Sequence, residues 1–220
     1  MSIFKYFMLE AHARAFMNKG ELLLRPLSYF RAHEDGQVRG DPRDALLTYA
    51  PISGLEVTKE DGTSLTLEGW RFTSSAKHDN IFVYCASSHL SIELAARFES
   101  SFCVEICSEH LVSRLKRRAS RTSTLDYEGL VSGPVEYRNP EKKPGADWAL
   151  PETVAFIKPE GYAWQEEFRI AIGKRGAFEA ENVDCALESG QAARAASSDA
   201  PPPLILRIGK LADFTQLHRF

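Results

Sequence analysis

Alternating side chains between residues 162 and 172 constrain the fold more than any other part of the sequence. Apolar residues recur at every second position from Phe168 to Ile172, which is the period of a β-strand with one buried face. Successive strand side chains point to opposite faces, so the alternation predicts that Gln165, Glu167 and Arg169 share the other face. Such a polar row is typical either of the floor of a polar cleft or of the solvated side of a sheet.

The chain is long enough for one domain with a substantial core, since it has 220 residues of which 44% are hydrophobic. Its formal net charge of −3 gives no global basic field, so any contact with nucleic acid has to be local. The N-terminus carries charges too early for a signal peptide, and no apolar run approaches the ~18 residues of a membrane helix. We therefore expect a cytoplasmic protein.

The four cysteines predict neither a zinc site nor a disulfide framework. They show no C-x-x-C pairing, and none of the six histidines falls into ligand spacing with them. Cys103 and Cys107 lie among apolar residues, so we expect both to be buried thiols in a reducing compartment.

The order of the elements predicts an α+β fold, with mixed, mostly antiparallel sheets and a few short helices. Helices are expected at about 9–18, 91–98, 108–118 and 151–158. Strands are expected at 3–7, 21–24, 80–86, 102–107 and 203–208, with a hairpin or meander over 47–73 and one bent strand or two strands over 125–138. The apolar run 80–86 predicts a central strand buried on both faces.

We expect a single domain over residues 1–185. An Ala/Ser/Pro-rich segment, 186–203, lacks periodicity and predicts a loop. Residues 204–220 are expected to supply a C-terminal strand that packs on the same domain.

Positive charge gathers at the end of the helix expected over 108–118. The cluster comprises Arg114, Lys116, Arg117, Arg118 and Arg121. Cations suit a helix C-terminus electrostatically, so a solvated helix end explains the cluster without a partner. The alternative is contact with phosphates, which would make the cluster a docking surface for RNA or DNA.

Several polar residues have no evident role in folding, while the common nucleotide-binding, metalloprotease and α/β-hydrolase motifs are absent. These residues are Lys5 and Tyr6 in the first strand, Arg25, Ser28, Tyr29, Arg31, Arg39 and Asp41 around a charged loop, and Gln165 and Glu167 late in the chain. Taken singly, each is typical of a half-buried aromatic, a helix cap or a surface charge.

Together they resemble an uncharacterised family of bacterial and phage proteins that closes on a Trp-x-x-Glu-x-Glu-aromatic-Arg strand. The matching segments are Phe4-Lys5-Tyr6, Ser28-Tyr29-Phe30-Arg31, Glu34-Asp35, Arg39-Gly40-Asp41-Pro42, Phe82 to Ser87, and Gln165-x-Glu167-Phe168-Arg169. The layout, over about the first 175 residues, is similar to the ADP-ribosyltransferase fold. The chain departs from the family at Arg31-Ala32-His33, where Asn-Asp-Pro is common, at Gln165 for Glu and at Tyr162 for Trp.

The resemblance implies an NAD-dependent mono-ADP-ribosyltransferase with Glu167 as the catalytic carboxylate. The reaction breaks the bond between nicotinamide and ribose through an oxocarbenium-like state, which a fixed carboxylate stabilises. Gln165 would hold the acceptor through its amide, and it implies an amide or a guanine base, in protein or nucleic acid, rather than arginine. NAD would bind through arginine for its pyrophosphate and tyrosine for its rings, in a site drawn from Lys5, Tyr6, Ser28, Tyr29, Arg31, Arg39 and Asp41.

Such a protein would act as a toxin or phage-conflict effector, and a neutralising antitoxin or chaperone would be its partner. NAD hydrolysis at the same site is a close variant. A different class of function is a non-catalytic module that binds nucleic acid or protein through the charged 31–43 loop and the basic helix end. A third alternative is a nuclease that holds a metal with Asp41 and Glu167.

Overall fold

The structure is a computed structural model that describes residues 1–32, 44, 46–76, 78–189 and 201–220. Eight strands form the main sheet, in which every pairing is antiparallel. In sheet order they are β14 (Leu204–Arg207), β2 (Glu21–Pro26), β7 (Ile81–Ser87), β1 (Ser2–Phe7), β8 (Phe102–Cys107) and β15 (Thr215–Arg219), with β12 (Glu167–Lys174) beside β7 and β9 (Leu125–Pro134) beside β12.

Three smaller sheets complete the β-structure. They are β13 (Val183–Ser189), β6 (Trp70–Ala76) and β3 (Leu46–Tyr49); the hairpin of β4 (Leu55–Thr58) and β5 (Ser64–Leu67); and the parallel pair of β10 (Glu136–Arg138) and β11 (Ile157–Pro159). The α-helices are α1 (Glu10–Lys19), α2 (Leu27–Ala32), α3 (Ile92–Arg97), α4 (Ser108–Ala119) and α5 (Pro151–Val154). The 3₁₀ helices are η1 (His78–Asn80), η2 (Ala146–Ala149), η3 (Glu160–Gln165), η4 (Ala180–Asn182) and η5 (Ala212–Phe214). The α+β class with mostly antiparallel sheets is confirmed.

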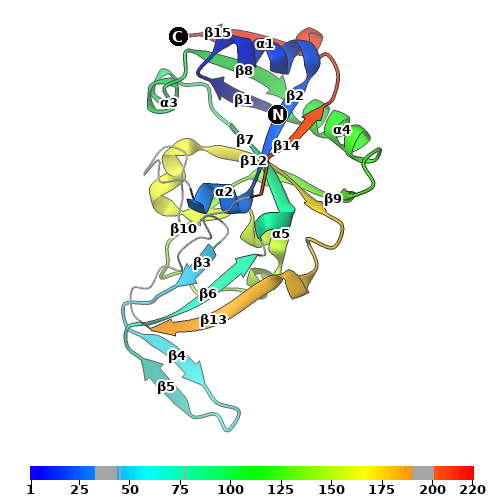
Figure 1. Cartoon of the computed structure of the whole chain (residues 1–220). Coiled ribbons are helices and arrows are strands. Elements are labelled where there is room, and N and C mark those ends of the chain that lie inside the picture. The colour runs from blue at the N-terminus through cyan, green and yellow to red at the C-terminus, as the bar shows by residue number, and fades with distance from the viewer. Residues whose placement is uncertain (33–43, 45, 77, 190–200) are drawn as a thin grey trace.

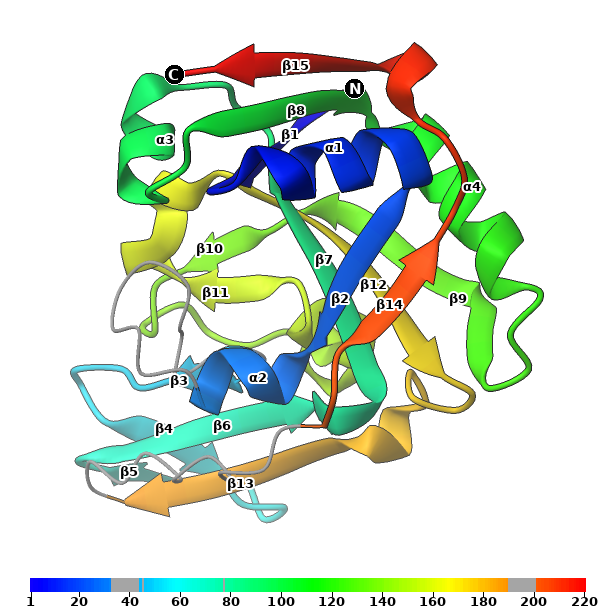
Figure 2. The ribbon, with the colours of Figure 1, turned by 45° about the horizontal axis from the view of Figure 1, so that its top comes forward.

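β7 is the centre of the main sheet, as its apolar sequence predicts. One of its edges pairs with β12 along its length, and the other is shared by β2 and β1. Almost every residue of β7 is buried, because packed elements cover both faces of the strand. In Figure 2 β7 runs through the middle of the molecule. In the order of the sheet, β2 and β14 follow one edge of β7, and β12 and β9 follow the other.

The two faces of the sheet belong to two separate hydrophobic clusters. The first cluster joins Phe168, Ile170 and Ile172 to α1 and α4, so the predicted apolar face of β12 is confirmed. The second cluster contains Ala171 with Leu27 of α2 and Val154 of α5. Glu167 and Arg169 alternate with the first set and therefore point to the α2–α5 side of the sheet.

Two helix boundaries show the chemistry that is typical of helix ends. Gly20 ends α1 in the left-handed conformation at φ 59°, and its N–H bonds to the carbonyl of Phe16. Ser91 caps α3, since its hydroxyl accepts a hydrogen bond of 3.2 Å from the N–H of Leu94.

The hairpin of β4 and β5 extends away from the rest of the chain (Figure 1). Its turn includes Gly62 at φ 83°, with the N–H of Gly62 bonded to the carbonyl of Lys59. This turn lies within the segment 47–73, where a hairpin or meander is expected, and glycine suits it because it adopts positive φ without a steric penalty.

Three expectations from the sequence are wrong. Residues 186–189 are not a loop, since they continue β13, which pairs with β6 as far as Ser189 opposite Trp70. The helix expected over 151–158 ends at Val154, because Ile157 already pairs with Glu136 in the β10–β11 ladder. Cys107 is exposed and contacts the Glu109 carboxylate, whereas Cys103 is buried.

The four cysteines are free thiols in the described part of the chain. Among the helices described, none is long and apolar enough to cross a membrane.

Candidate active site

Glu167 is the first residue of β12, and its side chain is only 6% exposed. Glu166 precedes it in the left-handed conformation at φ 43°, with its own side chain exposed. Gln165 is the last residue of η3, so the expectation that it lies on the same strand face as Glu167 is wrong. A left-handed residue breaks the extended geometry on which that alternation depends.

Glu167 and Arg169 belong to a group of buried charges that we call the buried charge cluster: Asp44, Lys158, Glu167 and Arg169. These side chains are 6% exposed or less. The polar row of β12 is therefore neither an open cleft floor nor the solvated side of a sheet, because α2, α5 and η3 lie on this side of the sheet.

Arg169 is the central cation of the cluster and is fully buried. Its Nη1 and Nη2 atoms donate to the two oxygens of Asp44 at 2.8 and 2.7 Å. Its Nε atom donates to Glu167 Oε1 at 2.5 Å, and Nη1 also reaches the carbonyl of Ala155 at 2.6 Å. The planar guanidinium thus fixes two carboxylates and the end of α5 in one geometry.

Lys158, from β11, connects Glu167 to Gln165. Its Nζ atom lies 2.8 Å from Glu167 Oε2, donates to Gln165 Oε1 at 2.9 Å and lies 3.9 Å from Asp44 Oδ2. The ring of Tyr162 in η3 stands 5.3 Å from the same ammonium group. Gln165 and Glu167 are therefore brought together through a shared cation rather than along a strand.

The cluster holds two carboxylates and two cations, and electrostatics keeps it ionised. Burial alone would raise the pKa of Glu167, but Arg169 and Lys158 outweigh it and hold that pKa well below its usual range. Burial would lower the pKa of Lys158, but Glu167 and Asp44 raise it above its ordinary value. Burial raises the pKa of the neighbouring Cys85 thiol to about 12, so this thiol is neutral.

The backbone around Glu167 is fixed from both sides. The N–H of Glu167 donates to the hydroxyl oxygen of Tyr137 at 2.8 Å. The carbonyl of Glu166 accepts hydrogen bonds from the N–H of Ser88 at 2.8 Å and from its hydroxyl at 3.1 Å. These contacts hold the left-handed Glu166 in place, so the position of the Glu167 carboxylate is set by the scaffold.

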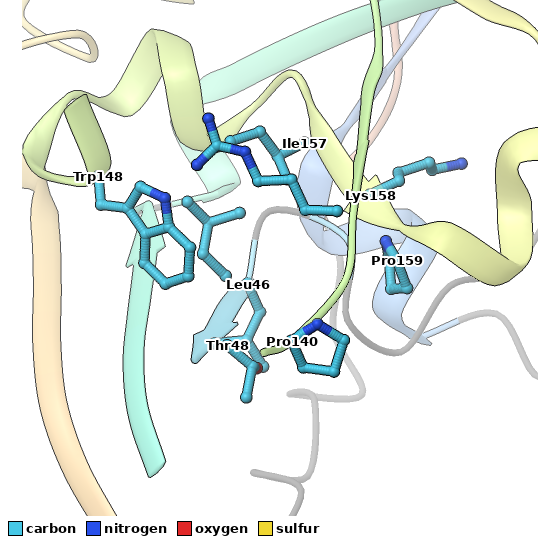
Figure 3. A pocket seen from close by; sticks show the side chains of 9 residues that line it. Leu46, Thr48, Pro140, Trp148, Ile157, Lys158 and Pro159 are labelled. Atoms are coloured by element: carbon cyan, nitrogen blue, oxygen red, sulfur yellow. The ribbon is translucent and has the colours of Figure 1, made fainter. Parts of the chain in front are cut away.

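A small pocket lies beside the cluster (Figure 3). Trp148, Pro140 and Pro159 line it together with Thr48, and the Lys158 side chain extends away from Trp148. The pocket volume is about 30 Å³, roughly the space of one water molecule. The indole N–H of the buried Trp148 has no hydrogen-bond partner among the described residues.

The two first-strand residues expected to bind NAD have structural contacts. Phe4 and Glu167 both pair with Ser87, so these three residues share a face and the neighbouring Lys5 points to the opposite one. There the Lys5 Nζ atom is 4.8 Å from the Tyr84 ring centroid. Tyr6 donates through its hydroxyl to the carbonyl of His89 at 2.9 Å and accepts from the N–H of Ser91 at the same distance. The expectation that Lys5 lines a common cleft with Glu167 is therefore wrong.

Two further residues expected to bind NAD, Ser28 and Tyr29, lie in α2, which packs on the same side of the sheet as Glu167. Ser28 is buried, and its hydroxyl has no hydrogen-bond partner within the described residues. The ring of Tyr29 lies 4.1 Å from the guanidinium carbon of Arg25. Arg39, Asp41 and the Arg31 side chain lie outside the described part of the structure.

The basic cluster lies on the other side of the sheet from Glu167. α4 packs Leu111, Leu115 and Ala119 into the first hydrophobic cluster. Arg114 and Arg118 are half-buried, while the remaining members are exposed: Lys116, Arg117 and Arg121. An acceptor docked at this helix end would therefore not be presented directly to Glu167.

Three groups that hold the site are not among the residues predicted from the sequence: Lys158, Asp44 and Tyr137. Lys158 stands between the buried Ile157 and a proline, and a lysine inside an apolar segment was the available signal. Asp44 and Tyr137 carry no such signal, because they reach the site only through the tertiary fold.

Within the described residues, no group of three or more His, Cys, Asp or Glu side chains is placed to hold a metal ion. Asp41, one of the two residues considered for a nuclease, lies outside these residues. Comparison of the chain with protein-family models, with curated proteins and with solved structures finds no significant match.

Proposed function

We propose that the protein is an NAD-dependent mono-ADP-ribosyltransferase with Glu167 as its catalytic carboxylate. The observation that carries the proposal is the position of Glu167 at the start of a buried strand, where Arg169 and Lys158 hold its carboxylate and the same lysine bonds to Gln165. A carboxylate of this kind stabilises positive charge as it develops on ribose.

The reaction requires little of the protein beyond the stabilisation of this positive charge on ribose. The bond between nicotinamide and ribose C1′ breaks, nicotinamide leaves as a neutral molecule, and an acceptor atom attacks C1′ and loses a proton. Each oxygen of a carboxylate accepts about two hydrogen bonds, so Glu167 retains capacity for a ribose hydroxyl beside its contacts with Arg169 and Lys158. Gln165 would orient the acceptor through its amide.

The proposal requires the site to open when NAD binds. The pocket beside Lys158 has a volume of about 30 Å³, and a nicotinamide ring needs several times this space. Movement of Lys158 away from Glu167 Oε2 would give the ribose access to that oxygen, and Arg169 would still hold Oε1.

The test uses purified protein with NAD labelled in the adenosine part. Release of nicotinamide, together with label on RNA, DNA or protein, is the expected result for the wild type and for the control Glu166→Gln, whose side chain is exposed. Glu167→Gln should lower turnover by 100-fold or more and keep the circular-dichroism spectrum. Equal turnover by Glu167→Gln, or none by the wild type with any of these acceptors, contradicts the proposal. Nicotinamide release without a labelled acceptor would assign NAD hydrolysis instead.

A non-catalytic binding module is the second candidate, and the charge balance of the cluster favours it. Two anions and two cations satisfy one another, so the cluster needs no charged ligand to be stable. In that case NAD should not raise the melting temperature. Binding of nucleic acid should weaken steeply with salt and depend on the exposed cations Lys116, Arg117 and Arg121.

A further inference from the structure

A second pocket, separate from the one beside Lys158, opens between the end of β9 and α5. Its volume is about 280 Å³, which is near the lower end of small-ligand sites. Pro134, Phe156 and Ile157 provide much of its apolar lining. Glu136 and Glu152 supply the charged groups.

Among the described residues, only one of these two carboxylates has a charged neighbour. Glu136 accepts from Arg138 Nε at 2.8 Å and from Arg138 Nη2 at 3.0 Å, and Lys142 Nζ lies 3.2 Å from its Oε1 atom. The guanidinium forms a bidentate pair with it, so little of its charge is available to a ligand.

Glu152 presents the opposite situation. Its Oε2 atom is shielded from solvent and has no hydrogen-bond partner among the residues that the structure describes. A carboxylate oxygen in this state has lost its water without compensation, which is unfavourable until a donor binds. The pocket thus combines an apolar wall with one unsatisfied negative group.

We propose that this pocket binds a small organic cation with a planar donor group, of the amidinium or guanidinium class. Rotation of the Glu152 carboxylate would turn its shielded Oε2 atom into the pocket, where two parallel N–H donors match a carboxylate. A flat apolar body then fits against Phe156 and Pro134. A bare metal ion does not fit this surface, because the described residues offer no group of three metal-ligating side chains.

Benzamidine is the probe, and benzamide is its uncharged control of the same shape. Titration calorimetry with the full chain should show saturable binding of benzamidine and at least 10-fold weaker binding of benzamide. Glu152→Gln keeps the shape of the side chain and should weaken benzamidine binding at least 10-fold. Glu160→Gln, an exposed carboxylate in η3, should leave binding unchanged.

Val131→Phe provides an independent test if Glu152→Gln fails to fold. Val131 lines the pocket, so a phenyl ring there should fill it and abolish benzamidine binding while Glu152 is retained. The proposal is overturned if the wild type does not bind benzamidine, if benzamide binds equally well, or if Glu152→Gln or Val131→Phe binds as the wild type does. Loss of binding in Glu160→Gln would also overturn it, because the effect would then be one of general charge.

Discussion

Arg169 shows how much a single residue contributes to this fold. It is fully buried and bonds to Asp44, Glu167 and the carbonyl of Ala155. A buried ion pair gains little net free energy over an apolar replacement, but removal of one partner leaves a buried charge without compensation. The stability of the cluster is therefore a property of the set and not of any one pair.

A double-mutant cycle tests this coupling. Arg169→Met should lower the free energy of unfolding by about 3–5 kcal/mol, because two carboxylates then share one lysine. Asp44→Asn combined with Arg169→Met should be less destabilising than the sum of the single changes, since Lys158 and Glu167 remain balanced. Urea denaturation measures the effects.

Arg14→Met is the matched control for that cycle. Arg14 pairs with Glu10 on the exposed side of α1 at 2.7 Å, and its removal should change stability by at most ~0.5 kcal/mol. Additive effects of the two cluster changes would contradict the coupled arrangement.

Substitution of Gly20 provides a second test at a single residue. It has φ 59°, and a Cβ atom there would lie 2.2 Å from the carbonyl oxygen of Gly209. Gly62 has φ 83° with open space around it, so Gly62→Ala introduces backbone strain alone, about 1 kcal/mol. Gly20→Ala should lower the urea midpoint clearly more than Gly62→Ala, and equal midpoints would show that the close approach is absent.

Among the strands and helices, β15 has a role that can be tested by itself. It covers the edge of β8, and Phe220 beyond it stacks on Tyr6 at a ring distance of 6.1 Å. An uncovered strand edge offers unpaired N–H and C=O groups to other chains. The last strand therefore protects the sheet from edge-to-edge association.

Deletion of residues 215–220 should lower the melting temperature and produce dimers or larger species in sedimentation velocity. Phe220→Ala is the control, because it removes the ring contact and keeps the strand pairing. This variant should remain in the association state of the full chain. If the truncated chain has the sedimentation and melting temperature of the full chain, β15 does not protect the sheet.

The elements that the sequence predicts well are those with local signals. The period-2 pattern of β12 and the apolar run of β7 depend on neighbours along the chain. β15 carries no such pattern, and it is a strand because β8 has a free edge beside it.

The residues of the candidate site also differ in how far the sequence predicts them. Glu167 stands out through its motif, but the partners that decide its state come from distant segments: Asp44 lies 125 positions from Arg169. The alternation of side chains predicts the wrong position for Gln165, because it assumes extended backbone at Glu166. Glu166 is left-handed, and positive φ is uncommon for a residue other than glycine.

For the whole molecule, the titration of the buried groups defines a pH range of maximum stability. The pKa of Glu167 is lowered on folding, so its contribution is present above its unfolded pKa of about 4.3 and is lost as the pH falls below that value. Burial raises the pKa of Tyr137 to about 12, so its contribution is present below its unfolded pKa of about 10 and is lost as the pH rises toward 12. We expect a plateau between about pH 5 and 9.

Urea midpoints measured across pH test these two limits. Glu167→Gln should make the acid limb shallower, and Tyr137→Phe should make the alkaline limb shallower, each without altering the other side. Tyr137→Phe also loses the acceptor of the Glu167 N–H, so its plateau should be lower by about 1 kcal/mol. Acid and alkaline limbs identical to those of the wild type would assign the titration to other groups.

β12 has a consequence for how this chain can change in evolution. Its odd-numbered positions 167 and 169 carry the buried charges, and its even-numbered positions 168, 170 and 172 fill the first hydrophobic cluster. Insertion or deletion of one residue would exchange the two sets and drive the charges into the apolar layer under α1 and α4. Length changes within β12 should therefore be tolerated only in pairs of residues, and descendants of this chain should vary in length in the connections between strands.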